Sequence, residues 1–275
     1  MCETTYFYKN NILAHSILQN KGTRLFLILA GFFLANALVA EFIGVKIFQL
    51  EDTLGIPKFN WSLFGIDLSL QYSAGVLMWP VVFVMTDVIN EYYGKRGVKF
   101  LSWGAVFLIV YAFFMIYGAI ALEPTDWWKV TGEKSGVPNM QAAFSKIFGQ
   151  GLLIIVGSIA AFLLAQLVDV TVFQQIKKAT GESKVWLRAT GSTLVSQLID
   201  SFVVTGIAFY FGPRIIGSAD GGWTFAQYIA ISTNGYIYKF LMAILLTPVI
   251  YAAHHFIDKY LGDELAVKMK AEAAL

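Results

Sequence analysis

Six long apolar runs constrain this chain more than any other feature of its sequence. Each run is long enough to cross a lipid bilayer, which needs about 20 apolar residues per helix. The runs are continuous rather than alternating, which argues against the strands of a membrane barrel. We therefore expect six spanning helices, at residues 24–48, 70–92, 99–122, 149–175, 188–212 and 226–256.

The composition supports a membrane-embedded chain. Of its 275 residues, 57% are hydrophobic and 14% are charged, whereas a soluble domain carries about 25% charged residues. We expect an all-α polytopic membrane protein, a six-transmembrane-helix bundle that forms one domain over residues 1–275, with a polar N-terminal head at 1–23 and a cytoplasmic tail at 257–275. The net charge of +2, without a basic stripe, indicates no nucleic-acid partner.

Lysine and arginine in the connections predict the orientation. Thirteen of the 20 lie on the side that holds both chain ends, six lie on the opposite side, and Lys239 falls within the sixth run. Because cytoplasmic loops carry the excess of Lys and Arg, both termini are expected in the cytoplasm. The outer connections are expected to be loops with short interfacial pieces: EDTLGIPKFNWSLFGID, EPTDWWKVTGEKSGVPN and FGPRIIGSADGGW.

Polar residues inside the runs are the informative ones, because an ionisable side chain at the bilayer centre costs about 2.5–3.5 kcal/mol. Gln-x-x-Asp occurs twice, as Gln166/Asp169 in the fourth run and Gln197/Asp200 in the fifth. With 3.6 residues per turn, the two members of each pair share one helix face. The other runs add Asn36, Asp87, Asn90, Glu91 and Lys239.

Polar contacts that only hold helices together are one interpretation of this set, since amides and hydroxyls bridge many membrane bundles. That role does not need carboxylates on three helices and a buried lysine, so a water-filled or ligand-filled pocket accounts for the set better. Lys239 is the natural counter-ion for Asp200 or for a carboxylate of the second run. Pro80 and Pro248 permit helix breaks, and broken helices at membrane depth often line a substrate site.

The paired amide and carboxylate indicate a kind of ligand. Gln offers donors and an acceptor, whereas a carboxylate offers acceptors only. Side by side they match a planar edge with N–H groups and a carbonyl, as in a guanine-like ring, and Phe173 could stack on the ring face. Small amides, vitamins or a proton path would also fit these residues.

Several stretches resemble one family of membrane proteins. MTDVINEYYGKR, AQLVDVTVFQQIKK and WLRATGSTLVSQLIDS, together with Lys239 and Pro248, are similar to the queuosine precursor transporters, also called the vitamin uptake transporter or DUF165 group. The resemblance covers residues 30–255 or so. It implies a six-helix carrier in the bacterial inner membrane that imports 7-deazaguanines, such as 7-cyano-7-deazaguanine, for the synthesis of queuosine in tRNA.

The resemblance also implies where the substrate binds. The matching positions in this chain are Asp87, Asn90, Glu91, Gly94, Arg96, Gln166, Asp169, Phe173, Arg188, Ser192, Gln197, Asp200 and Lys239. With Asn36 added, and without Gly94 and Arg96, these are the expected substrate-binding residues. No metal and no cofactor is expected, and the expected partners are a small-molecule substrate and the lipid bilayer.

The residues themselves leave other functions open. No GxxxxGK[ST] loop is present, so energy coupling is either absent, or uses a proton on Asp or Glu, or comes from a separate ATPase, as in the vitamin-binding subunits of energy-coupling-factor transporters. An intramembrane enzyme is the rival class, but HExxH, GxSxG, DDxxD and GxGD are missing. A scaffolding protein would bind no ligand. The preferred deazaguanine and the oligomeric state, a homo-oligomer included, stay open.

Overall fold

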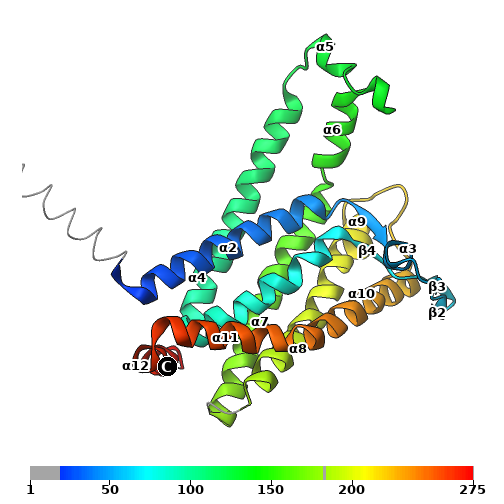
Figure 1. Ribbon diagram of the computed structural model, residues 1–275. Coiled ribbons are helices and arrows are strands. Elements are labelled where there is room, and N and C mark those ends of the chain that lie inside the picture. Colours follow the sequence, from blue (N-terminus) through cyan, green and yellow to red (C-terminus); the bar gives the residue numbers. More distant parts are fainter. Residues whose placement is uncertain (1–18, 182–183, 275) are drawn as a thin grey trace, which may run out of the picture.

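The structure is a computed structural model that describes residues 19–181 and 184–274 (Figure 1). The α-helices are α2 (Lys21–Ile43), α3 (Leu50–Leu54), α4 (Trp79–Ala121), α5 (Asp126–Lys129), α6 (Met140–Phe148), α7 (Leu152–Thr180), α8 (Val185–Thr205), α9 (Gly212–Ile215), α10 (Phe225–Leu245), α11 (Thr247–Leu261) and α12 (Asp263–Ala273). The 3-10 helices are η1 (Ala74–Leu77) and η2 (Glu133–Ser135), and η3 (Gly206–Phe211) is a π-helix. The strands are β1 (Ile47–Gln49), β2 (Trp61–Leu63), β3 (Ile66–Leu68) and β4 (Gln71–Ser73).

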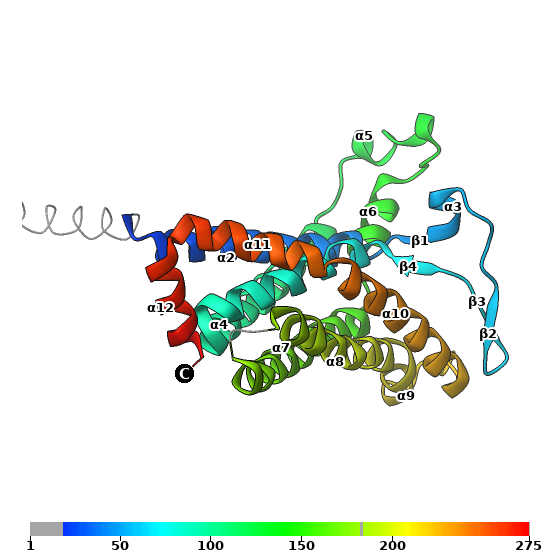
Figure 2. The ribbon, with the colours of Figure 1, turned by 60° about the horizontal axis from the view of Figure 1, so that its bottom comes forward.

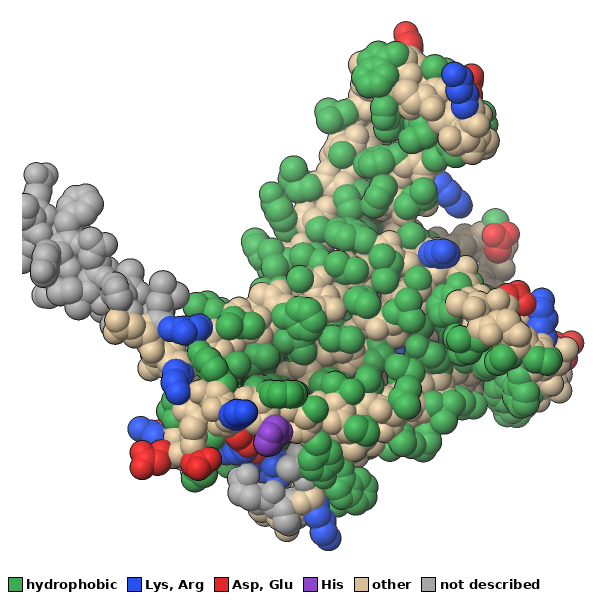
Figure 3. All heavy atoms as spheres, viewed as in Figure 1, with side chains coloured by type: hydrophobic (Ala, Val, Ile, Leu, Met, Phe, Trp, Pro, Cys, Tyr) green, Lys and Arg blue, Asp and Glu red, His purple; other side chains and the backbone are tan. Residues whose placement is uncertain are grey.

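Four helical segments of the described chain have the length and composition to cross a membrane, and the bent pair α10 and α11 makes a fifth. Apolar side chains cover most of the face seen in Figure 3, whereas charged side chains gather near the ends of the molecule. On α4, Phe100, Phe107 and Phe114 are at least 70% exposed, as a lipid-facing surface requires. The expected all-α polytopic membrane protein is confirmed, and the number of six crossings remains a prediction.

The helix α4 holds the second and third expected spans and is broken at Gly94. This residue has φ 66° and ψ −172°, a conformation open to glycine but costly for other residues. A Cβ atom at Gly94 would also lie 2.7 Å from the carbonyl oxygen of Ala273 in α12. The two arms, 79–93 and 95–121, run in different directions (Figure 1). If each arm crosses the membrane, the chain has the six crossings that the sequence predicts.

The first arm of α4 begins later than expected. Residues 70–78 are not part of the helix, because β4 and η1 precede Trp79. Ser73 Oγ accepts a hydrogen bond from the Gly75 amide at 3.2 Å and donates to the Gly44 carbonyl at 2.7 Å, which ties this turn to the end of α2. Pro80 then stands in the first turn of α4, where a missing N–H costs nothing. Pro80 therefore starts a helix and does not kink one.

The first outer connection contains more structure than the expected loop. β1 pairs with β4 in antiparallel register, with Phe48 opposite Tyr72, and β2 pairs with β3. Glu51 of α3 is fully buried between them, and its carboxylate accepts a hydrogen bond from the Leu70 amide at 3.0 Å. Burial raises the pKa of Glu51, but hydrogen bonds from backbone amides outweigh it and lower the pKa below its usual value.

The sixth expected span is broken, as Pro248 predicts. α10 and α11 meet at Leu246 with a bend of 43°, and Pro248 lies in the first turn of α11. Beyond α11, the residues expected as a tail form α12, which packs against α4 and α11 at one end of the molecule (Figure 2). Lys270 of α12 pairs with Asp258 at 2.8 Å. The C-terminal segment is therefore a docked helix.

Close helix packing places the polar face of α4 inside the molecule. α7 and α8 lie side by side (Figure 2). Their backbones approach closely, since a Cβ atom at Gly157 would lie 3.1 Å from the Val204 carbonyl oxygen. The first arm of α4 packs between α2 and this pair, while α10 and α11 cover α8. The polar side chains of α4, α7 and α8 thus point toward one another rather than toward lipid.

Candidate functional site

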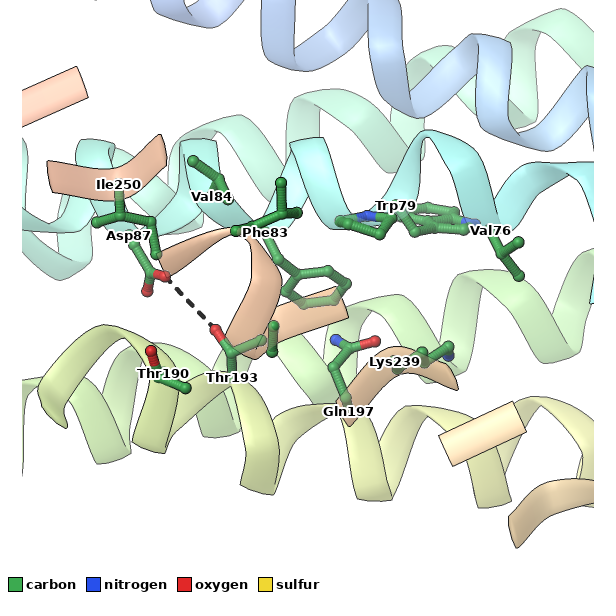
Figure 4. A pocket seen from close by; sticks show the side chains of 13 residues that line it. Val76, Trp79, Phe83, Val84, Asp87, Thr190, Thr193, Gln197, Lys239 and Ile250 are labelled. Carbon is green, nitrogen blue, oxygen red and sulfur yellow. Dashed lines mark hydrogen bonds between the residues drawn. The ribbon is translucent and has the colours of Figure 1, made fainter. Parts of the chain in front are cut away.

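A cavity lies where the first arm of α4 faces α8, beneath α10 and α11 (Figure 4). Trp79 and Phe83 of α4 form an aromatic wall, and Ile250 of α11 closes one end. The cavity has a volume of about 20 Å³. The cavity is therefore a narrow slot with room for little more than water between its walls.

Three polar side chains meet in this slot from opposite walls. Asp87 comes from α4, and Thr193 and Gln197 come from α8 (Figure 4). Thr193 Oγ1 donates to Asp87 Oδ2 at 3.4 Å. Asp87 Oδ1 and Gln197 Nε2 are buried and have no hydrogen-bond partner among the described residues. The slot thus presents one free acceptor and one free donor, although the side chains themselves are only 1% and 3% exposed.

Lys239 of α10 supplies the cation beside the slot. Its ammonium group forms an ion pair with the Asp200 carboxylate of α8, and both side chains are less than a fifth exposed. This contact confirms the expectation that Lys239 is a counter-ion for Asp200. The pairing neutralises both groups, so a neutral ligand can lie next to them without a net charge nearby.

The Gln166 and Asp169 pair of α7 lies behind the slot and is not part of its lining. Gln166 Nε2 donates to Thr86 Oγ1 at 2.9 Å, and Ser196 Oγ donates to Asp169 Oδ1 at 3.2 Å. Both residues are buried, and Gln166 Oε1 and Asp169 Oδ2 lack a partner in the described part of the chain. Of the two Gln-x-x-Asp pairs, only Gln197 on α8 lines the slot, and Asp200 reaches it through its ion pair with the lining residue Lys239.

Glu91 is the centre of a separate buried ion cluster. Arg188 Nη2 of α8 lies 2.8 Å from Glu91 Oε1, and Lys177 Nζ of α7 lies 3.3 Å from the same oxygen. All three side chains are at most 3% exposed. Lys177 also donates to the Lys270 carbonyl at 3.2 Å, which links the cluster to α12. Glu91 and Arg188 thus join α4 to α8 instead of bordering the slot.

The remaining expected site residues make contacts elsewhere. Asn36 donates to Phe32 O of its own helix at 2.8 Å, and Asn90 accepts from Gln174 at 2.8 Å. Phe173 is fully buried and packs with Ala189 and Ile250, with the Arg188 guanidinium 5.9 Å from its ring. Ser192 donates to Ala189 O at 3.1 Å.

Four polar residues near these clusters were not predicted from the sequence, namely Thr86, Gln174, Lys177 and Thr190. Lys177 had a usable signal, because it stands eleven positions after Gln166 and four after Phe173, on the same helix face. Helix periodicity could not predict a role for the hydroxyl of Thr86, since threonine is common in spanning helices. Thr190 borders the slot and shares a hydrogen bond of 2.9 Å with Thr247.

The arrangement suits recognition of a flat, uncharged ring with mixed donors and acceptors. The free acceptor of Asp87 matches ligand N–H groups, and the free amide N–H of Gln197 matches a ligand carbonyl. Trp79 and Phe83 offer faces for a planar group. Within residues 19–181 and 184–274, no three His, Cys, Asp or Glu side chains come together as metal ligands do.

Comparison with known proteins gives two matches. The family model described as "Putative vitamin uptake transporter" matches residues 73–253. A curated protein of Bacillus subtilis (strain 168), named "Probable queuosine precursor transporter", is 30% identical over 192 residues, which cover 70% of this chain and 73% of that protein. No solved structure matches. The chain therefore belongs to the vitamin uptake transporter family, and it is a multi-pass membrane transporter rather than an enzyme.

Proposed function

We propose that this protein imports a 7-deazaguanine, such as 7-cyano-7-deazaguanine, as a precursor of queuosine in tRNA. One observation carries the proposal: Asp87 Oδ1 and Gln197 Nε2 are buried in the walls of one slot and have no partner among the described residues. Buried polar atoms in proteins nearly always have a partner. A ligand with the complementary groups supplies both partners at once. The name of the B. subtilis relative points to the same class of substrate.

In the proposed complex, the ring lies between the aromatic wall of α4 and the polar face of α8. The N1–H and the exocyclic amine of the ring donate to Asp87, and the ring carbonyl accepts from Gln197. Thr193 holds the second oxygen of Asp87, so the carboxylate is oriented before the ligand arrives. Asp200 orients the Lys239 ammonium in the same way.

The slot is narrow, so the ring enters only when its walls separate. Leu246 stands at the break between α10 and α11 and also lines the slot. A change in the 43° bend at this break would move the cover formed by α10 and α11 away from α8. Opening first to one side of the membrane and then to the other is the motion that a carrier needs.

The test uses a bacterium that can make neither the queuosine precursor nor its own transporter for it. Cells that express this chain are fed 7-cyano-7-deazaguanine, and queuosine in tRNA is measured. We expect queuosine with the wild type and its loss with Gln197→Ala and with Asp200→Ala. The matched controls are Gln71→Ala and Asp67→Ala, which change exposed residues of the outer hairpins. Membrane levels of each variant are compared by immunoblot.

Normal queuosine with both Gln197→Ala and Asp200→Ala would reject the proposed site. The family description names vitamins, so purified protein is also screened against deazapurines and vitamins by thermal shift. Stabilisation by a vitamin, and by no deazapurine, would replace the proposed substrate with that vitamin. Chemical conversion of a bound deazapurine would instead favour an enzyme.

A further inference from the structure

The buried carboxylates of the spanning helices are not all neutralised by cations. Glu91 has two partners, Arg188 and Lys177, and Asp200 has Lys239. Asp87 and Asp169 have no cation among the described residues, although each is at most 1% exposed. Glu41 at the end of α2 also has no cation within residues 19–181 and 184–274, but its carboxylate accepts a hydrogen bond from Ser158 on α7. The counter-ions of the bundle thus leave one neighbouring pair, Asp87 and Asp169, uncompensated.

Hydroxyl groups of α8 contact both carboxylates of this uncompensated pair. Thr193 donates to Asp87 Oδ2 at 3.4 Å, and Ser196 donates to Asp169 Oδ1 at 3.2 Å. Thr193 lies one turn before Ser196 on α8, so the two carboxylates contact neighbouring positions on the same face of that helix. The outer oxygen of each carboxylate, Oδ1 of Asp87 and Oδ2 of Asp169, has no donor in the described chain. Gln166 Oε1, on a side chain only 3% exposed, is a third acceptor without a donor.

Two neighbouring carboxylates cannot both stay ionised in such surroundings. Removal from water disfavours each charge, and the repulsion between the charges disfavours the second one further. A proton shared by the pair removes one charge and fills one of the vacant acceptor positions. Hydroxyl groups can pass that proton along, because each is both a donor and an acceptor.

We propose that Asp87 and Asp169 form a proton-binding pair that couples import of the ligand to the movement of one proton in the same direction. The inference rests on the proposed function. On the outer side, an O–H bond forms between a proton from water and one carboxylate oxygen. On the inner side, that O–H bond breaks and the proton returns to water, while no bond to the ligand forms. Asp87 belongs to the proposed pair and also lines the slot, so ligand binding and proton binding act on the same side chain.

The other charged groups around the pair are already engaged. From α4 and α8 these are Glu91 and Arg188, which pair with each other, and from α7 it is Lys177, which joins them. Lys239 of α10 faces Asp200, and Glu41 of α2 faces Ser158. On α11, His254 lies 3.3 Å from the Tyr92 hydroxyl and Asp258 pairs with Lys270. A change of pH is therefore expected to act first on the carboxylate pair without a cation.

The experiment uses the purified full-length chain in liposomes, with the membrane potential held at zero by potassium and valinomycin. Radiolabelled 7-cyano-7-deazaguanine is first exchanged across the liposome membrane at equal pH. Its uptake is then measured with a gradient of one pH unit, the inside of the liposomes being alkaline. One proton per ligand predicts about tenfold accumulation on the alkaline side, since one pH unit is a tenfold ratio of proton activity. Asp169→Asn is expected to exchange the ligand but to accumulate it to a ratio of about one.

Asp67→Asn, in the exposed outer hairpin, is the matched control and should accumulate the ligand about tenfold, as the wild type does. Asp169→Glu keeps a carboxylate and should keep the coupling, which separates loss of the proton site from loss of the fold. No exchange by the wild type would overturn the proposed function and this inference with it. Exchange without a response to the pH gradient, or accumulation driven by a sodium gradient instead, would overturn this inference and leave the import function standing.

Discussion

At the residue scale, Gln197 and Asp87 are side chains that are expected to bind the ligand and that also lower the stability of the ligand-free protein. Each holds a buried polar atom without a partner in the described part of the chain, and such an atom costs about 1–3 kcal/mol of stability. A side chain that binds a ligand but has no partner within the protein destabilises the ligand-free fold. The same atoms that are expected to bind the substrate are therefore expected to weaken the protein that lacks it.

This reasoning predicts the effect of Gln197→Leu on stability. The change keeps the volume and removes the unpartnered Nε2, so the ligand-free protein should gain about 1 kcal/mol. Thermal unfolding of the detergent-purified protein measures it, with Gln71→Leu on the exposed β4 strand as the control. A clear loss of stability in Gln197→Leu alone would mean that the Gln197 amide has a structural role.

The Glu91 cluster should behave in the opposite way. Glu91→Ala leaves Arg188 and Lys177 buried and facing each other, and breaking a buried ion pair costs about 3–5 kcal/mol. We expect less folded protein in the membrane and a lower unfolding temperature. The double variant Glu91→Leu, Arg188→Leu should recover part of the loss, because it removes a charge of each sign. An equal loss in both variants would show that packing, and not charge, governs this position.

The sequence predicted which residue types form the site more readily than it predicted which residues they contact. Charge predicted that Lys239 pairs with Asp200 or with a carboxylate of the second run, and the structure places it against Asp200. Helix periodicity also placed Gln166 and Asp169 on one face, but it could not say that this face meets α4 behind the slot. Lys177 looked like a loop cation, because the end of α7 at Thr180 and the cover by α12 depend on tertiary packing.

At the scale of elements, the break in α4 and the docking of α12 depend on each other. Gly94 turns the chain between the two arms, and the end of α12 occupies the space that a side chain there would need. Proline predicted a helix break correctly at Pro248, where the residue begins a new helix after a bend. The same prediction was wrong at Pro80, which begins α4, because the sequence does not distinguish a proline in the first turn of a helix from a proline at a kink.

Gly94→Ala is predicted to damage the protein in two separable ways. The backbone conformation costs about 1–3 kcal/mol for a residue with a Cβ atom, and the Cβ atom also meets Ala273 at 2.7 Å. In a chain that ends at Gly262, only the first cost remains. Thermal unfolding of the four proteins, with and without α12 and with Gly or Ala, gives the coupling. Additive effects would contradict the contact between Gly94 and α12.

At the scale of the whole molecule, the beginning and the end of the described chain lie together. Lys21 at the start of α2 donates to the Tyr260 carbonyl at the end of α11, at 3.0 Å. Tyr93, beside the break in α4, donates to the Gly22 carbonyl at 2.8 Å. Both ends of the described chain therefore lie at one end of the helix bundle, and the hairpin of β2 and β3 lies at the other end (Figure 2). The excess of Lys and Arg predicts that the side with the ends is cytoplasmic.

Reporter fusions test that orientation. Green fluorescent protein fused after Leu275 should fluoresce, and alkaline phosphatase at the same place should be inactive. Alkaline phosphatase inserted at Gly65, in the turn between β2 and β3, should be active. The reverse pattern of activities would place the termini outside the cell and invert the expected direction of import.

Equilibrium binding to the purified protein tests the central claim most directly, because it needs neither coupling nor cell metabolism. Titration of the wild type with 7-cyano-7-deazaguanine should show saturable binding to one site per chain. Gln197→Leu should weaken that binding about tenfold or more, the equivalent of one lost hydrogen bond, and Gln71→Leu should not. Absence of binding to the wild type, or equal affinity in Gln197→Leu, would contradict recognition of a deazaguanine in this slot.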